Sequence, residues 1–297
     1  MVVTKTHTLT GHKGAIYSII STSDNVFISG GSDGYVCLWD IDKTSDGRVL
    51  LNANETIFSL ALNADKNLLA VGTMNGNLHL FDVTKKELIK SISAHQKCVY
   101  AVYHNENTLA TAGGDGALTF WNTQNYLPTE TLILSSKALR SIAASADKKH
   151  LYISASDSNF FVVDAFNHNV IATIEAHENS VFCVQQNSIT QEIWTGSRDA
   201  HLKIWAADGF LLRQAVPAHI ATINDIAFSP DGGLAATASR DKTIKIWHTT
   251  TYELLKVIDY SKYSAHKNSV NKVIWLDAIT IASCSDDSTI LLFRVER

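Results

Sequence analysis

Short runs of apolar and β-branched residues, interrupted by tight turns, follow one another along the chain. After His219 the sequence reads IATINDIAFSPDG, then GLAATASRDK, TIKIWH and ELLKVID. The runs are rich in Val, Ile, Thr and aromatic residues, and Asp-Gly or similar dipeptides separate them, as in strands joined by hairpin turns. Helical periodicity is absent throughout. The pattern therefore predicts four strands in this stretch and an all-β chain.

This four-strand unit recurs seven times. The segment GSDGYVCLWD, which ends at Asp40, returns for example as AGGDGALTFWN, ending at Asn122, and as TASRDKTIKIWH, ending at His248. The aromatic position near its end, or the apolar equivalent, falls at Trp39, Phe81, Trp121, Val163, Trp205, Trp247 and Phe293. Successive positions are 42, 40, 42, 42, 42 and 46 residues apart. Seven such units use up the chain, so we expect one repeat domain over residues 1–297.

Four side chains recur at nearly fixed spacing within the units. A His lies 20 to 22 residues before a turn Asp, a Ser or Thr lies four before that Asp, and a Trp lies six after it. The complete sets are His12, Ser29, Asp33 and Trp39; His95, Thr111, Asp115 and Trp121; His177, Thr195, Asp199 and Trp205; and His219, Thr237, Asp241 and Trp247. The seventh unit has His266, Ser283 and Asp287, with Phe293 in place of Trp.

This arrangement resembles the WD-repeat family of β-propellers. The resemblance implies a seven-bladed propeller of four-stranded antiparallel blades, in which each His, Ser or Thr, Asp and Trp form a hydrogen-bonded tetrad. Units 2 and 4 depart from the pattern, because they lack the His. They carry Val71, Asn75 and Phe81, and Ile153, Asp157 and Val163, at the other three positions. Their internal hydrogen bonding stays unassigned, and we expect them to be the softer blades.

The two ends of the chain complement each other. Six units have an apolar strand after the Trp position, whereas the chain ends four residues after Phe293. The N-terminal segment KTHTLTGH resembles the strands that precede the other histidines. We therefore expect the N-terminal strand to complete the seventh blade and to leave no open sheet edge between the termini.

Composition narrows the functional classes. A hydrophobic fraction of 45% excludes a disordered chain, and a net charge of -4 predicts no nucleic-acid partner. No stretch of 18 apolar residues occurs, and the N-terminus MVVTKTHTLTGHK lacks the apolar core of a secretory signal. Cys37, Cys98, Cys183 and Cys284 form no Cys-x-x-Cys pair, so we expect free, mostly buried thiols. These features favour a cytoplasmic protein without a membrane partner.

The recurring Ser, His and Asp suggest a hydrolase only superficially. An active site is needed once, yet this constellation occurs five times, so a structural network is the better interpretation. The other histidines show no metal-ligand spacing, and AGGDG at residues 112–116 opens no helix and is read as a hairpin turn. We therefore predict no catalytic residue, no metal and no cofactor.

Binding residues are expected on one face of the propeller. In the family, the residue five after the tetrad His opens onto the narrow top of the central channel, which here gives Tyr17, Phe58, Tyr100, Arg140, Phe182, Asn224 and Asn271. The residue before each turn Asp lies on the same face, namely Ser32, Met74, Gly114, Ser156, Arg198, Arg240 and Asp286. Four aromatic residues and three arginines on one rim have the composition of a recognition surface.

We therefore predict a non-catalytic scaffold that binds a protein or peptide at this face, as a monomer within a hetero-complex. Arg140, Arg198 and Arg240 favour a partner with an acidic or phosphorylated residue. Two alternatives stay open. In the first alternative this face binds nothing, because the aromatics pack only against the blade tops and the arginines pair with acids such as Asp225 or Glu178. In the second alternative the protein is a propeller enzyme or ligand sensor with a site at the channel mouth.

Overall fold

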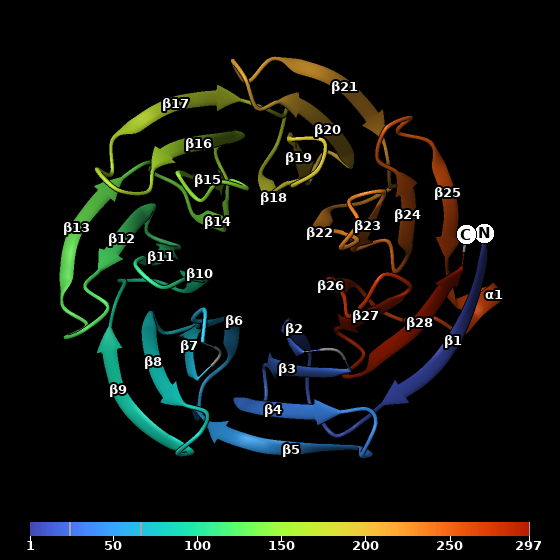
Figure 1. Cartoon of the computed structure of the whole chain (residues 1–297), viewed down its shortest axis with the longest axis horizontal. Helices are drawn as coiled ribbons and strands as arrows, with labels where there is room; N and C mark the ends of the chain where they lie inside the picture. The colour runs from blue at the N-terminus through green and yellow to red at the C-terminus, as the bar shows by residue number, and fades with distance from the viewer. Residues whose placement is uncertain (24, 66, 297) are drawn as a thin grey trace.

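Seven four-stranded antiparallel sheets surround a central channel in the computed structural model, which describes residues 1–23, 25–65 and 67–296 (Figure 1). This confirms the predicted seven-bladed all-β propeller. The first strand of each blade lines the channel and contacts the first strands of both neighbouring blades. The fourth strand of each blade forms the outer wall (Figure 1).

The strands follow the repeat along the chain. Blade 1 contains β2 (Ile16–Ser23), β3 (Val26–Gly31), β4 (Tyr35–Asp40) and β5 (Thr44–Asn52). Blade 2 contains β6 (Ile57–Leu62), β7 (Leu68–Thr73), β8 (Asn77–Asp82) and β9 (Glu87–Ser93). Blade 3 contains β10 (Val99–His104), β11 (Leu109–Gly113), β12 (Ala117–Trp121) and β13 (Pro128–Ile133). Blade 4 contains β14 (Leu139–Ala144), β15 (His150–Ala155), β16 (Asn159–Asp164) and β17 (Val170–Glu175).

The remaining blades continue the same order. Blade 5 contains β18 (Val181–Gln186), β19 (Glu192–Ser197), β20 (His201–Ala206) and β21 (Leu212–Pro217). Blade 6 contains β22 (Ile223–Phe228), β23 (Leu234–Ser239), β24 (Ile244–His248) and β25 (Leu254–Ile258). Blade 7 contains β26 (Val270–Trp275), β27 (Thr280–Ser285), β28 (Ile290–Glu296) and the N-terminal β1 (Val2–Leu9).

The N-terminal strand closes the ring as predicted. Strand β1 pairs antiparallel with β28, from Val2 opposite Glu296 to Leu9 opposite Ile290. Val3 and Leu9 are buried, so β1 contributes to the core as well as to the ladder. A second link joins blade 7 to blade 1, because Asn271 Nδ2 donates to the carbonyl of Ile16 at 2.9 Å. The two chain ends therefore lie side by side (Figure 1).

A short helix, α1 (Tyr260–Tyr263), interrupts the all-β pattern between blades 6 and 7. The strand pattern of the sequence gives no indication of this helix, although the longer interval of 46 residues before Phe293 contains it. Asp259 caps the helix by accepting a hydrogen bond from the backbone N–H of Lys262. Ser264 ends the helix in the left-handed conformation, with a φ of 48°.

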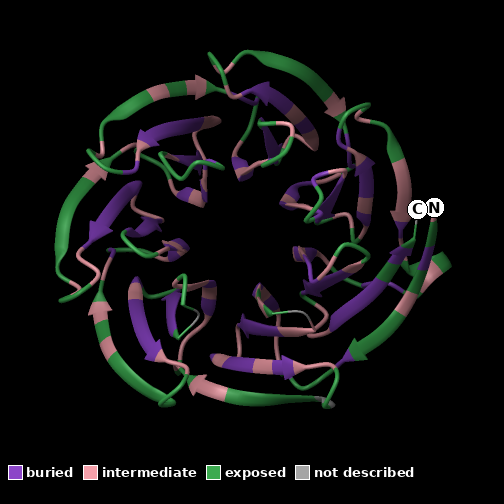
Figure 2. Ribbon diagram, viewed as in Figure 1, coloured by how far each residue is buried: buried purple, intermediate pink, exposed green. Residues whose placement is uncertain are grey.

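The outermost strand of each blade is largely exposed, whereas the strands inside it are more deeply buried (Figure 2). The inner three strands of each blade are mostly buried, and hydrophobic clusters fill the space between adjacent blades. One cluster joins Trp39 and Phe27 of blade 1 to Leu292 of blade 7. The four cysteines are free thiols, and Cys37, Cys183 and Cys284 are buried, as expected.

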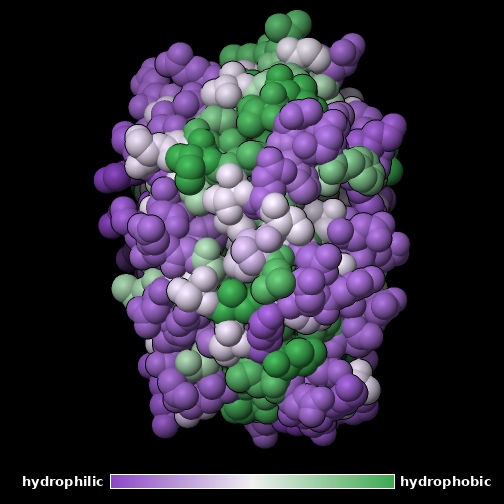
Figure 3. Space-filling view, turned by 90° about the vertical axis from the view of Figure 1, so that its left-hand side faces the viewer, coloured by the Kyte–Doolittle hydropathy of each residue, from purple (hydrophilic) through white to green (hydrophobic). Residues whose placement is uncertain are grey.

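Apolar side chains remain exposed on the outer wall. They include Ile89 of β9, Ile133 of β13 and Ile171 of β17, together with Phe166 in the turn before β17. In a side view of this wall, hydrophobic residues gather in a vertical band between polar flanks (Figure 3).

Candidate functional site

The structure contains a hydrogen-bonded tetrad in blade 6 that links the start of the inner strand to the turn between β23 and β24. His219 Nδ1 lies 2.8 Å from Asp241 Oδ2, and His219 Nε2 lies 2.8 Å from Thr237 Oγ1. Trp247 Nε1 donates to the same Thr237 oxygen at 2.9 Å. The network is satisfied when Nδ1–H donates to Asp241 and the threonine hydroxyl donates to Nε2.

The same geometry recurs in blades 1, 3 and 5, and blade 7 has it without the Trp. Across the five blades, the Nδ1–carboxylate distances are 2.8–3.1 Å and the Nε2–hydroxyl distances are 2.7–2.9 Å. The four Trp Nε1–hydroxyl distances are 2.7–3.0 Å. These histidines and their carboxylates hold the tops of the five blades together.

Blades 2 and 4 replace the missing histidine in different ways. In blade 4, Ser135 occupies the histidine position and donates to Asp157 Oδ2 at 2.6 Å. In blade 2, Ala53 occupies that position, and Glu55 takes over two residues later. Its carboxylate accepts from Asn77 Nδ2 at 2.9 Å and lies 3.2 Å from His79 Nε2. The hydrogen bonding that the sequence left unassigned is thus supplied by other side chains; the lower stability of these blades stays a prediction.

The tetrads are poor candidates for nucleophilic chemistry. Burial lowers the pKa of His95, His177 and His219, which favours neutral imidazoles. Although burial raises the pKa of Asp241, hydrogen bonds from His219 and Thr243 hold it well below its ordinary value. Ser29, Thr195 and Thr237 are completely buried, so no substrate reaches their hydroxyl groups. This supports the structural interpretation of the repeated Ser or Thr, His and Asp.

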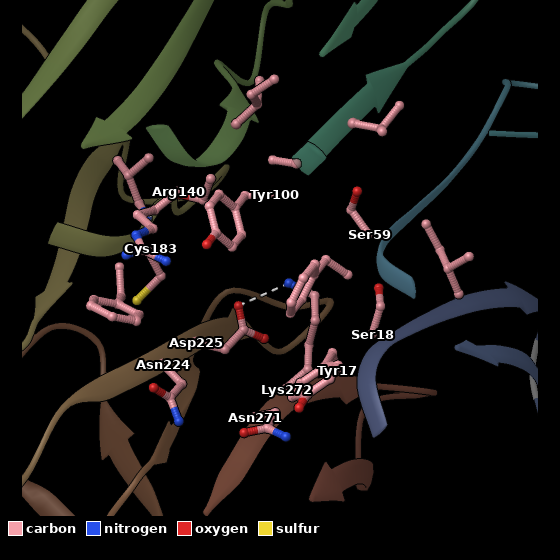
Figure 4. A pocket seen from close by; sticks show the side chains of 18 of the residues that line it. Tyr17, Ser18, Ser59, Tyr100, Arg140, Cys183, Asn224, Asp225, Asn271 and Lys272 are labelled. Carbon is pink, nitrogen blue, oxygen red and sulfur yellow. Dashed lines mark hydrogen bonds and ion pairs between the residues drawn. The ribbon is translucent and has the colours of Figure 1, made fainter. Parts of the chain in front are cut away.

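A different set of side chains surrounds the top of the channel. The end of the ring that carries the tetrad histidines and the turn aspartates is called the top face. The seven residues predicted at its centre line one cavity of about 310 Å³ (Figure 4). This set, the channel mouth, consists of Tyr17, Phe58, Tyr100, Arg140, Phe182, Asn224 and Asn271.

A β-bulge explains why these residues point into the channel. In all seven blades the register between the first two strands shifts at the mouth residue, for example between Ile16 and Ser18 around Tyr17. A bulged residue has no partner on the neighbouring strand and its side chain is re-aimed. The bulge also breaks strand parity, which is why Asn224 leaves the buried side of the strand to which Ile226 belongs.

The mouth residues of blades 1 to 5 form a continuous arc. The ring centroids of Tyr17 and Phe58 lie 5.0 Å apart, and those of Phe58 and Tyr100 lie 5.3 Å apart. The Arg140 guanidinium carbon lies 4.5 Å from the centroid of Tyr100 and 4.8 Å from that of Phe182. Arg140 is thus held between two aromatic rings by cation–π contacts.

Arg140 has no carboxylate partner. Its Nε donates to Ser156 Oγ at 2.7 Å, and no ion pair within residues 1–23, 25–65 and 67–296 involves it. The two amides of the mouth are committed differently. Asn224 Nδ2 donates to Val270 O at 2.8 Å, and Asn271 Nδ2 donates to Asp286 Oδ1 at 2.7 Å as well as to Ile16 O. The amides therefore connect blades 6, 7 and 1.

Arg198 and Arg240 lie on the same face but outside the cavity. Both are exposed in the turns before Asp199 and Asp241, and neither lines the channel mouth. Within the part of the chain that the structure describes, they form no ion pair. Asp225, suggested as their partner, instead pairs with Lys272 at 3.1 Å. The three predicted arginines are therefore split between the mouth and the surrounding loops.

Comparison with known families agrees with this geometry. A family model described as WD domain, G-beta repeat matches residues 3–40, 168–206, 211–248 and 259–294, which together are about half of the chain. The chain belongs to the WD40 repeat family. A second model, the WD40 domain of anaphase-promoting complex subunit 4, matches residues 38–107.

Several WD40 proteins align over much of the chain. The nuclear distribution protein nudF of Emericella nidulans is 25% identical over 91% of this chain and 66% of its own length. The WD repeat-containing protein slp1 of Schizosaccharomyces pombe is 24% identical over 78% of this chain and 49% of its own length. A guanine nucleotide-binding protein subunit beta of Oryza sativa is 29% identical over 65% of this chain and 43% of its own length. The chain thus spans less than two thirds of the length of these relatives.

This WD40 propeller has one feature at the channel mouth that the repeat pattern did not predict. The residues directly after the mouth positions form a second row in the cavity wall: Ser18, Ser59, Ala101, Ser141, Cys183, Asp225 and Lys272. Asp225 and Lys272 form an ion pair between blades 6 and 7 (Figure 4). Asp225 Oδ2 also accepts from the backbone N–H of Val273. Although burial lowers it, the attraction of Asp225 raises the pKa of Lys272. Two opposite charges at the same position of adjacent repeats were the available signal.

The described residues contain neither a metal cluster nor a helix suited to a membrane. No group of three or more His, Cys, Asp or Glu side chains among them is arranged to hold a metal ion. Likewise, in the described ranges no helix has the length and apolar character required to cross a bilayer.

Proposed function

We propose that this WD40 propeller is a non-catalytic scaffold that binds a segment of a partner protein at the channel mouth. The observation that carries the proposal is the bulge in every blade, which directs seven side chains from seven repeats into one cavity. Four of these side chains are aromatic and half-buried, and accessible aromatic clusters next to arginine are typical of interface hot spots. The tetrads supply the rigid frame.

The partner is proposed to be a protein or peptide with an acidic or phosphorylated residue next to a hydrophobic one. Arg140 inside the mouth and Arg198 and Arg240 around it support an anionic group, because guanidinium groups bind carboxylates and phosphates in a fork. The relative from Oryza sativa is, by its name, a subunit of a larger protein. By analogy, we propose that the present chain is also a subunit, a cytoplasmic monomer within a hetero-complex.

The mouth is tested by a double variant. Phe58→Ala with Tyr100→Ala removes the centre of the aromatic arc, and we expect partners captured from native lysate by the wild-type protein to be lost. The matched control is Ile133→Ala with Phe166→Ala, which removes two exposed apolar side chains from the outer wall. Quantitative mass spectrometry of the captured proteins is the measurement. Equal recovery by both double variants, at equal thermal stability, would place the binding surface elsewhere.

Neutralising the loop arginines should weaken a partner that spans the top face. For Arg198→Ala with Arg240→Ala we expect a loss of at least about tenfold in affinity, or about 1.4 kcal/mol. The salt dependence of the Kd should also flatten, because exposed charges are screened. The control, Lys43→Ala with Lys149→Ala, removes two exposed positive charges from turns at the opposite end of the blades. Unchanged binding by a folded arginine variant would restrict recognition to the mouth.

A further inference from the structure

We propose that the channel mouth recognises a single carboxylate, an Asp or Glu side chain of the partner, through Arg140, and discriminates against a phosphate at that position. This inference rests on the proposed function and deepens it. Arg198 and Arg240 are then peripheral, and the anion specificity is set inside the cavity.

Arg140 is a preorganised cation that lacks a counterion. Its side chain is half-buried between the rings of Tyr100 and Phe182, and Ser156 fixes the Nε end of the guanidinium. A partly desolvated positive charge without an ion-pair partner is costly, and an incoming anion removes that cost. Because the two rings and Ser156 already restrict the side chain, little conformational entropy is lost when the anion binds.

The charges of the cavity wall define how much negative charge it accepts. Arg140, Asp225 and Lys272 are the three charged residues among those that line it. Two positive charges and one negative charge leave a net charge of +1, which one carboxylate neutralises. A phosphate group carries about -1.5 to -2 at neutral pH and would leave excess negative charge beside Asp225. Asp286, hydrogen-bonded to Asn271 at the rim, adds a further carboxylate on that side.

The available donors favour the same ligand. Nε of Arg140 donates to Ser156, so the two terminal nitrogens, beside the Tyr100 hydroxyl, are the donors left to a ligand, and their geometry matches the two oxygens of a carboxylate. Lys272 already donates to Asp225 and stands at the opposite side of the ring, in blade 7 rather than blade 4. Recognition of a phosphate usually requires several arginines, and the cavity contains one. An apolar residue next to the carboxylate would contact the arc of Tyr100 and Phe58.

The test is a selection of random peptides displayed against the immobilised full-length protein. The tightest peptide is synthesised with its acidic residue, with the corresponding amide, and with phosphoserine at that position, and the Kd of each is measured by fluorescence anisotropy. We expect the amide peptide to bind at least about tenfold more weakly than the acidic one, and the phosphoserine peptide to bind no tighter. With Arg140→Gln, the acidic and amide peptides should become equivalent. Arg140→Lys, which keeps the charge but loses the fork, should fall between.

Each result decides between the inference and the function on which it rests. A phosphoserine peptide that binds more tightly than the acidic one overturns the inference, as does an amide peptide equal to the acidic one on the wild-type protein. If Arg140→Gln changes nothing while Phe58→Ala with Tyr100→Ala abolishes binding, the mouth remains the binding site and only the carboxylate assignment fails. Peptides unaffected by either change, or a selection without enrichment, would contradict both.

Discussion

A chain that lacks residues 3–10 is expected to lose the closed ring and to aggregate. Those residues form most of β1, whose backbone pairs with β28 and whose Val3 and Leu9 are buried. Their removal exposes the edge of β28 and opens the hydrophobic core of blade 7 to water. Unpaired strand edges template association with other chains. Size-exclusion chromatography should show oligomers, and the melting temperature should fall strongly.

A permuted chain provides the matched control for this deletion. Val2 lies opposite Glu296, so a short linker from the C-terminus to the N-terminus would turn β28 and β1 into a hairpin. A chain that starts after β1 and carries residues 1–10 behind this linker should regain the monomeric profile and the melting temperature of the wild type. If the simple deletion is monomeric with an unchanged melting temperature, β1 does not close the ring in solution.

The second large effect concerns the tetrads. We expect His219→Ala to lower the free energy of unfolding by about 1–3 kcal/mol, because it leaves the buried side chains of Thr237 and Asp241 without their hydrogen-bond partner. Tyr17→Ala should have a much smaller effect, because the bulged Tyr17 is half-buried at the cavity. Differential scanning calorimetry of both variants is the measurement. Comparable losses for the two changes would show that Tyr17 is part of the packed frame and not of a binding surface.

The fold could be predicted because the same four-strand pattern recurs in seven units of the sequence. Strand pattern, turn chemistry and the spacing of the tetrad residues agree in most units, and the missing last strand has an evident substitute at the N-terminus. Local departures were less accessible. In blade 2, Glu55 lies two residues after the position that the tetrad histidine occupies in five other blades. No spacing rule connects Glu55 to its partner His79 on β8. The helix α1 is too short to show a periodic pattern.

The lining of the channel mouth could be predicted in position but not in physical detail. The mouth positions followed from a fixed offset to the histidine, although Asn224 shares its strand parity with the buried Ile226. Strand parity does not decide the orientation of Asn224, because the bulge inserts one unpaired residue and leaves no clear signal in the sequence. The separation of Arg140 from Arg198 and Arg240, and the pairing of Asp225 with Lys272, depend on distances across the channel that no linear spacing contains.

Ring closure by the first strand has a consequence for biosynthesis. Within the propeller, β1 is synthesised before the other strands and its partner β28 after them, so β1 stays unpaired until the seventh blade has been made. The sequence of β1 is compatible with a long unpaired period, because its middle is polar: Thr4, Lys5, Thr6, His7 and Thr8 follow one another, and only a few apolar residues flank them. Such polar segments have a low tendency to form intermolecular β-structure. The nascent propeller can therefore carry an unpaired strand through the synthesis of six blades, and the ring closes only when β28 is available to pair with β1.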